Sequence, residues 1–152
     1  MTMTGFSFNA PTTMPDESIS NDGFFPNLQL NLIRESVRLD GSVSNPRLKD
    51  AAIAAMLEIN AQLGSLKFKA SALSELATST IDGKPNTELL YLRAIHSAIA
   101  ADINEKYRSY DSTGDGQKRA EELSPTIDEH RRNLRWAIRD LLGTSRCTVE
   151  LI

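Results

Sequence analysis

Apolar residues recur at intervals of three and four along most of the chain, which is the pattern of amphipathic helices. The first long stripe starts near residue 45 and comprises Leu48, Ala52, Ala55, Met56, Ile59 and Leu63. The second, over residues 87–110, comprises Leu92, Ile95, Ile99, Ile103 and Tyr107. The third, over residues 124–142, comprises Ile127, Leu134, Ala137, Ile138 and Leu141. The pattern therefore predicts three long helices.

The ends of these helices carry recognisable capping signals. Asn45 is a favourable N-cap residue, and Pro46 suits the first helical position. Ser124 and Pro125 form the same pair before the last stripe, so we predict that the last helix starts there. Residues 117–123 could already be helical, in which case Pro125 breaks or kinks the path. Gly143 follows that helix in the position that favours a left-handed residue.

A shorter helix is predicted over residues 27–40, where Asn27 could act as its cap. Leu28, Leu32 and Val37 then share one side of it. The segment between the first two long helices reads as a loop, and Asp82-Gly83 marks a turn within it.

Both ends of the chain differ from the helical middle. Residues 1–23 are rich in Thr, Ser, Asn, Pro and Gly and carry few large apolar side chains, so we expect an extended N-terminal arm that orders against neighbouring molecules. At the other end, polar and apolar residues alternate with a period of two, which is typical of a strand. This C-terminal tail consists of Arg146, Cys147, Thr148, Val149, Glu150, Leu151 and Ile152.

These patterns predict an all-α fold, a small helical bundle with one short and three longer helices. It has an extended N-terminal arm (residues 1–23), a helical bundle domain (24–145) and a C-terminal docking tail (146–152). No other strand of comparable quality is available to pair with the tail. We therefore expect the tail to add to the sheet edge of a partner.

Composition narrows the class of protein. The 152 residues carry a net charge of −3, which argues against nucleic-acid binding by the whole surface. A single cysteine excludes an internal disulfide and an all-cysteine metal site, and fits a reducing compartment. No apolar run approaches the ~18–20 residues of a membrane span, and no signal peptide is apparent. We expect a protein that folds in the cytoplasm and does not contact a membrane.

One segment resembles a calcium-binding loop. Asp111, Thr113 and Asp115 occupy its first, third and fifth positions, Gly116 its turn position and Glu122 its bidentate position. Thr113 is a weak ligand, and Lys118 and Arg119 add positive charge beside a dication. A calcium-regulated helical binding module is kept as the alternative to a Gly-rich connector, and no cofactor is assigned.

Trp136 lies about 200° around its helix from Leu134 and so points away from the apolar stripe. Its neighbours on the helix surface are Arg132 and Arg139. A tryptophan among arginines is typical of an interface anchor, and equally a second helix could cover it. Arg131 and Arg135 extend the basic face, which leaves weak contact with DNA open.

Nothing in the sequence indicates an enzyme. His96 and His130 fall on different predicted helices, and no spacing links either of them to Cys147 as a nucleophile–base pair. Motifs of hydrolases, nucleotide-binding loops and zinc proteases do not occur.

Several stretches together resemble the GpL-type head completion, or head stabilisation, proteins of tailed bacteriophages. They are FFP before RESVRLD, NPRLKDAAIAAMLEIN, YLRAIHSAIAADINEKYRSYD and TIDEHRRNLRWAIRDLLGTSRCTVELI, in this order over about residues 24–152. The final stretch is the most specific, and Pro125 is a local departure from the family pattern.

The resemblance implies a non-enzymatic structural protein of the virion, at the head–tail junction. Such proteins bind beneath the portal ring after genome packaging and prepare the head for tail attachment. The implied partners are the portal protein, neighbouring copies in a twelve-membered ring and a downstream tail-terminator or neck protein. Portal binding is expected from the tail, and subunit contacts from Trp136, Arg132 and Arg139. The resemblance brings no catalytic residues with it.

Overall fold

The computed structural model describes residues 16–39, 43–110 and 114–145, and the side chains of residues 108–110 and 114–125 are not defined within these ranges. The elements in chain order are β1 (Ser18–Ile19), β2 (Leu28–Gln29), α1 (Leu30–Val37), α2 (Asn45–Gln62), the 3-10 helices η1 (Gly64–Phe68) and η2 (Leu73–Leu76), β3 (Thr80–Ile81), β4 (Lys84–Pro85), α3 (Asn86–Tyr110) and α4 (Gly114–Leu142).

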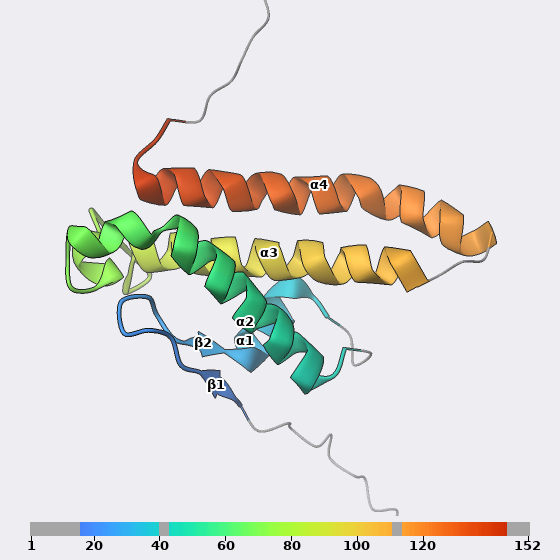
Figure 1. Cartoon of the computed structure of the whole chain (residues 1–152), viewed down its shortest axis with the longest axis horizontal. Coiled ribbons are helices and arrows are strands. Elements are labelled where there is room, and N and C mark those ends of the chain that lie inside the picture. The colour runs from blue at the N-terminus through green and yellow to red at the C-terminus, as the bar shows by residue number, and fades with distance from the viewer. Residues whose placement is uncertain (1–15, 40–42, 111–113, 146–152) are drawn as a thin grey trace, which may run out of the picture.

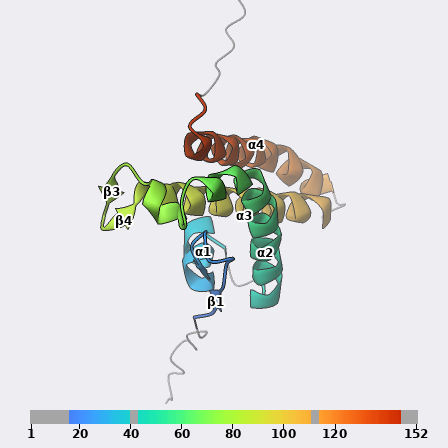
Figure 2. The same cartoon turned by 60° about the vertical axis from the view of Figure 1, so that its left-hand side comes forward.

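Helix α3 is the centre of the molecule. Figure 1 shows α4 running back along α3, while α2 crosses α3 at a steep angle. In the turned view of Figure 2, α4 covers one side of α3, and α1 and α2 cover the other. Tyr91, Ile95 and Ile99 of α3 are fully buried because both layers pack against them.

The predicted apolar stripes face this core, except that Tyr107 at the end of the α3 stripe is 44% exposed. Leu48, Ala52, Ala55, Met56, Ile59 and Leu63 are all buried. In α4, Ile127, Ala137 and Ile138 are buried, and Leu134 and Leu141 pack partly exposed against the core. The prediction of a mostly helical fold with one short and three longer helices is therefore confirmed for the described residues.

Two short antiparallel ladders were not predicted. β1 pairs with β2, so that Ile19 lies opposite Leu28. β3 pairs with β4 around the predicted turn, where Asp82 (φ 50°) and Gly83 (φ 72°) both adopt the left-handed conformation of a tight hairpin. Each strand has only two residues, so neither ladder produces a period-two pattern long enough to detect in the sequence.

The short helix begins later than predicted. α1 starts at Leu30 with Gln29 as its N-cap residue, and Asn27 does not cap it. Because Leu28 belongs to β2, the buried positions of the helix are Leu30 and Ile33, whereas Leu32 is 52% exposed. The expected stripe through Leu32 was wrong for this reason.

The start of α2 lies one residue from its predicted position. Ser44 is the N-cap residue, and Pro46 falls in the first turn as expected. The side chain of Asn45 instead accepts a hydrogen bond from Arg34 Nη2 at 2.7 Å, which ties α1 to α2.

Helix α4 does not start at Ser124. Its backbone is helical from Gly114 and continues through Pro125 to Leu142. An interior proline removes one helical hydrogen bond and costs about 3 kcal/mol or more. Packing of α4 along α3 offsets this local preference, as tertiary contacts commonly do.

The end of α4 is as predicted. Gly143 adopts a left-handed φ of 72° directly after the last helical residue. Its N–H donates to the carbonyl of Asp140 at 3.3 Å, and the N–H of Thr144 donates to the carbonyl of Arg139 at 3.0 Å. These two bonds form a Schellman motif, which satisfies the last carbonyls and turns the chain out of the helix.

Residues 16–23, which were expected within the N-terminal arm, pack on the helices. Ile19 is buried in the main core, and the N–H of Leu30 donates to the carbonyl of Glu17 at 2.9 Å. Lys49 of α2 forms an ion pair with Glu17. The remainder of the predicted arm, residues 1–15, lies outside the described residues.

Candidate interaction surfaces

Trp136 lies on the side of α4 that faces away from α3. Arg132, one turn earlier, places its guanidinium 4.8 Å from the centre of the indole ring, a cation–π contact. Arg139, one turn later, is exposed, whereas Trp136 itself is half-buried. The structure brings Arg132 and Trp136 into contact, and Arg139 follows one turn later on the same helix. These three residues are here called the Trp136 face.

The basic character of this helix is partly neutralised. Arg131 Nη2 lies 2.6 Å from Glu105 Oε2 of α3, and Arg132 Nη2 lies 3.8 Å from Glu129 Oε1. Both pairs are substantially exposed, so each contributes at most about 1 kcal/mol to stability. Only part of the predicted arginine cluster therefore remains available to attract an anionic partner.

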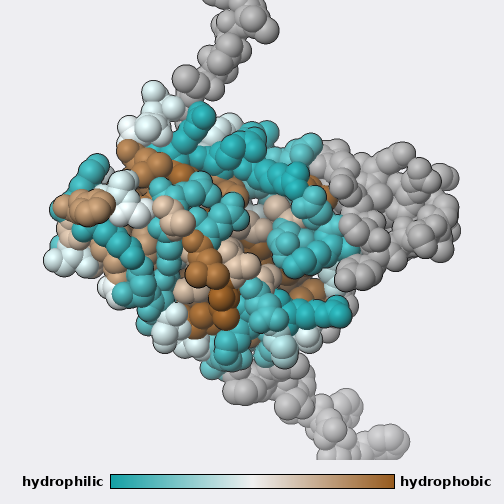
Figure 3. Space-filling view, viewed as in Figure 1, coloured by the Kyte–Doolittle hydropathy of each residue, from teal (hydrophilic) through white to brown (hydrophobic). Residues whose placement is uncertain are grey.

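A second exposed apolar surface lies on α2. Ile53 and Leu57, one turn apart on this helix, are 39% and 71% exposed. Figure 3 shows hydrophobic atoms interrupting the polar surface in the middle of the face that α2 crosses. The sequence analysis did not single out Ile53 and Leu57. They lie outside the apolar stripe of α2 that was predicted to face the core.

A groove of about 270 Å³ lies where the end of α4 meets η1, η2 and the start of α3. Its apolar lining consists of Leu66, Leu73, Leu76, Leu90, Leu141 and Leu142. The remaining lining residues are Lys69, Thr78, Asn86, Thr87, Asp140 and Gly143. We call it the C-terminal groove, because the chain leaves α4 at its rim.

A second groove of about 270 Å³ lies between the start of α2 and the last turns of α3. It is lined by Val43, Arg47, Asp50, Asp102, Lys106 and Tyr107, among others. The charges of both signs partly cancel, and Lys106 already pairs with Asp102 at 2.7 Å. This groove therefore shows no preference for an anion or a cation.

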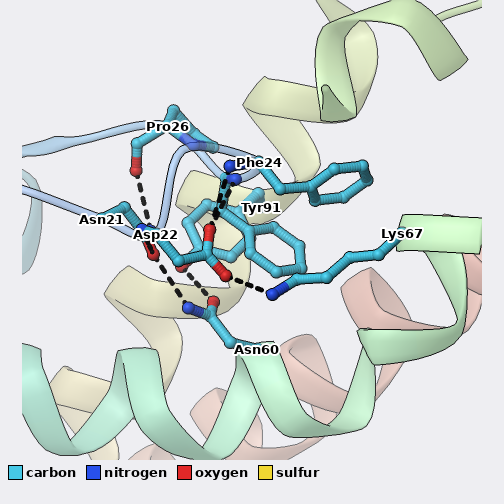
Figure 4. A network of polar contacts seen from close by, with 8 residues as sticks. Asn21, Asp22, Phe24, Pro26, Asn60, Lys67 and Tyr91 are labelled. Carbon is cyan, nitrogen blue, oxygen red and sulfur yellow. Dashed lines mark hydrogen bonds and ion pairs between the residues drawn. The ribbon is translucent and has the colours of Figure 1, made fainter. Parts of the chain in front are cut away.

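The most elaborate polar arrangement is a closed ring of hydrogen bonds. Asn21 Nδ2 donates to Tyr91 Oη at 2.9 Å, and Tyr91 Oη donates to Asn60 Oδ1 at 2.7 Å. Asn60 Nδ2 completes the ring by donating to Asn21 Oδ1 at 2.8 Å. Figure 4 shows the three side chains converging from the N-terminal segment, α2 and α3.

The ring has a structural role. Tyr91 is fully buried, and its hydroxyl needs a partner there. Phe25 stacks on Tyr91 with ring centres 5.0 Å apart, and Asn21 Nδ2 also donates to the carbonyl of Pro26 at 3.0 Å. Burial raises the pKa of Tyr91 to about 12, so the hydroxyl stays protonated and remains a donor.

Asp22 extends this arrangement to the surface. Its Oδ1 accepts from the N–H groups of Phe24 at 3.0 Å and Phe25 at 3.2 Å, and its Oδ2 pairs with Lys67. Burial alone would raise the pKa of Asp22, but these hydrogen bonds outweigh burial, so the pKa is lowered. The carboxylate therefore stays charged and holds the turn that begins the FFP stretch.

Sequence reasoning missed this network. A usable signal was present, because Tyr91 lies one turn before Ile95 on the inward side of α3, and an inward tyrosine requires a polar partner. The identity of that partner was not deducible, since Asn21 is 70 residues away in the chain.

The histidines show no catalytic arrangement. His96 lies on α3 and His130 on α4. Burial lowers the pKa of His96, which keeps the imidazole neutral at pH 7. Cys147 lies outside the described residues together with the rest of the tail, Arg146 to Ile152.

The calcium alternative gains no support from the backbone. Residues 114–122 are helical, whereas a calcium loop needs a sharp turn at its sixth position, here Gly116. The first three positions, residues 111–113, lie outside the described residues. Among the residues that are described, no three His, Cys, Asp or Glu side chains are grouped so that they could hold a metal ion.

No described helix has the length and apolar character needed to cross a membrane.

Comparison with known proteins gives a consistent answer. The family model described as phage head completion protein (GPL) matches residues 19–152. The head completion/stabilization protein of Escherichia phage P2 is 34% identical over 139 residues, which cover 88% of this chain and 82% of that protein. No solved structure shows significant similarity.

The match confirms the resemblance found in the sequence and extends it back to Ile19, the second residue of β1. The family is structural. The chain therefore belongs to the phage head completion protein (GPL) family, whose members are structural proteins of the virion and not enzymes.

Proposed function

We propose that this protein completes the phage head as a head–tail adaptor, binding beneath the portal ring after genome packaging and preparing the head for the tail. Membership of the family, and the similarity to the head completion/stabilization protein of phage P2, support this role. The site of action is then the head–tail junction of the virion, reached after assembly in the host cytoplasm.

In this role neighbouring copies form a ring that matches the portal, with twelve members expected from the resemblance. A closed ring requires each subunit to present two different surfaces to its two neighbours. The Trp136 face is one candidate surface, because it combines an aromatic residue with Arg132 and Arg139 on an outward helix side.

The tail is the proposed portal contact. Residues 146–152 alternate polar and apolar side chains, which suits addition to a sheet edge in a partner. The Schellman motif at Gly143 supports this, because it ends α4 and directs the chain away from the helix axis. A downstream neck or tail-terminator protein would bind the opposite face of the ring, and the remaining arginines of α4 would give weak contact with packaged DNA.

The observation that carries the proposal is the family match over residues 19–152, which includes the tail. We therefore expect that deleting residues 146–152 abolishes binding to the portal of the same phage. Helical circular dichroism should stay unchanged, because α4 ends at Leu142. Binding is read as the mass of the protein with and without portal.

A chain whose residues 146–152 are rearranged to remove the alternation, at constant composition, is the matched control. It keeps the length and charge of the tail and should also fail to bind. Portal binding that survives the deletion would overturn the proposed role of the tail.

A further inference from the structure

The C-terminal groove is an apolar surface with no occupant among the described residues. Leu66 and Leu73 are buried, and Leu76, Leu90, Leu141 and Leu142 are partly exposed beside them. Its volume of about 270 Å³ is below the ~300–1,000 Å³ of typical small-molecule sites. It is better suited to a few aliphatic side chains than to a cofactor.

The chain leaves α4 at the rim of this groove. Gly143 lines it and forms the Schellman motif that ends α4. Residues 146–152 continue from this point, and an extended segment of that length spans about 20 Å at ~3.3 Å per residue. A segment that starts at the rim of the groove therefore has ample length to lie in it.

The pattern of the tail matches the lining. In an extended segment, Cys147, Val149 and Leu151 share one side, and all three are apolar. Glu150 falls on the other side together with Thr148, so the charge of the tail faces away from the leucines.

We propose that in the free chain the tail, residues 146–152, lies in its own C-terminal groove with Cys147, Val149 and Leu151 against the leucine lining. This deepens the proposed function, on which it rests, because the same tail is the portal contact. The groove covers the apolar side of the tail until a portal sheet edge displaces it. Portal affinity is then reduced by the fraction of chains whose tail is seated.

The only thiol of the chain reports directly on the seated tail. The experiment measures how fast an uncharged maleimide modifies Cys147 in the full-length protein at pH 7. We expect the rate to be at least about tenfold lower than in the unfolded chain. The reason is that only chains with a released tail react, and these make up about 10% or less of the population. Val149→Asn, which places an amide against the lining, should restore fast modification. Leu76→Gln, which alters the groove, should do the same.

Two control variants match these changes in chemistry. Thr148→Asn alters the opposite side of the tail, and Leu57→Gln alters an exposed leucine of α2 outside the groove. Both should keep Cys147 protected. Circular dichroism of the Leu76→Gln chain shows whether the helices remain folded, and Val149→Asn tests the seat independently of the fold.

Modification of the native thiol at the unfolded rate would overturn the proposal, and so would protection that persists in Val149→Asn. Protection that disappears on dilution would mean that the tail occupies the groove of a second copy, which also contradicts seating in its own groove. None of these readouts involves portal, so loss of the seat is distinguishable from failure of the tail as the portal contact.

Discussion

Asn21 links three parts of the chain that are far apart in sequence. Its side chain bonds to Tyr91 of α3, Asn60 of α2 and the carbonyl of Pro26, while its own N–H donates to Asn27 Oδ1 at 2.7 Å. A buried polar ring of this kind stabilises only when every member has a partner. The described residues meet that condition, since they include no buried side-chain polar atom without a hydrogen bond.

Tyr91→Phe should lower the free energy of unfolding by about 1–3 kcal/mol, because it leaves Asn60 Oδ1 without its donor. The measurement is urea denaturation of the wild type, Tyr91→Phe, Asn60→Ala and the double variant. We expect a coupling of about 0.5–3 kcal/mol between the two positions. Costs that simply add would show that the two side chains do not act as one unit.

At the scale of single elements, the periodic stripes made the long helices predictable. Spacings of three and four in α2 and α3 reflect one face buried against a core, and this relation holds wherever a helix is long enough to repeat it. The position of α4's first residue was not predictable, because Pro125 carries a strong local signal that packing against α3 overrides.

The short elements were not predictable for a different reason. Ile19 in β1 is buried by residues distant in sequence, and its own segment is too polar to indicate this. The candidate surfaces also differ in whether the sequence could predict them. The Trp136 face was found from helix geometry, whereas the C-terminal groove needs η1, η2 and α4 in their folded positions.

The β3–β4 hairpin allows a test of how one turn is specified. Gly83→Ala should destabilise the protein by about 1–2 kcal/mol, because φ there is +72° and an added Cβ strains the left-handed backbone. Gly64→Ala is the matched control. An added Cβ meets nothing within 4 Å at either position, but Gly64 lacks the positive φ.

Gly64→Ala should therefore be neutral or should stabilise by about 0.4–1 kcal/mol. Both changes in the free energy of unfolding are measured from the midpoints of urea denaturation, provided that the dependence on urea concentration is unchanged. Equal effects of the two substitutions would show that backbone conformation at Gly83 does not specify the turn.

At the scale of the whole molecule, three unlike surfaces are available: the Trp136 face, the Ile53–Leu57 surface of α2 and the C-terminal groove. Figure 2 shows α4 and α2 on different sides of α3. Surfaces placed on different sides suit the head-to-tail contacts of a closed ring better than a two-fold dimer, which uses the same surface twice.

Trp136→Ala should weaken assembly on the portal about 30-fold or more, as expected for a hot-spot residue worth at least 2 kcal/mol. The melting temperature of the free chain should change less than assembly, because the cation–π pair with Arg132 that is lost involves an exposed arginine. Assembly is measured as the mass of the portal complex across a concentration series.

Phe68→Ala is the control, because Phe68 is 93% exposed on η1 and lies outside the Trp136 face. It should leave assembly unchanged. A large fall in melting temperature for Trp136→Ala, without an effect on assembly, would assign the indole to the interior of the fold.

The Asn21–Tyr91 bond also sets an order in time. The two residues are 70 positions apart, so the bond cannot form on the ribosome until the start of α3 has been synthesised. The same holds for the backbone bond from the N–H of Leu73 to the carbonyl of Phe24. The segment at residues 16–29 is therefore made early and can pair locally, but its bonds to η2 and α3 wait until those elements have been synthesised.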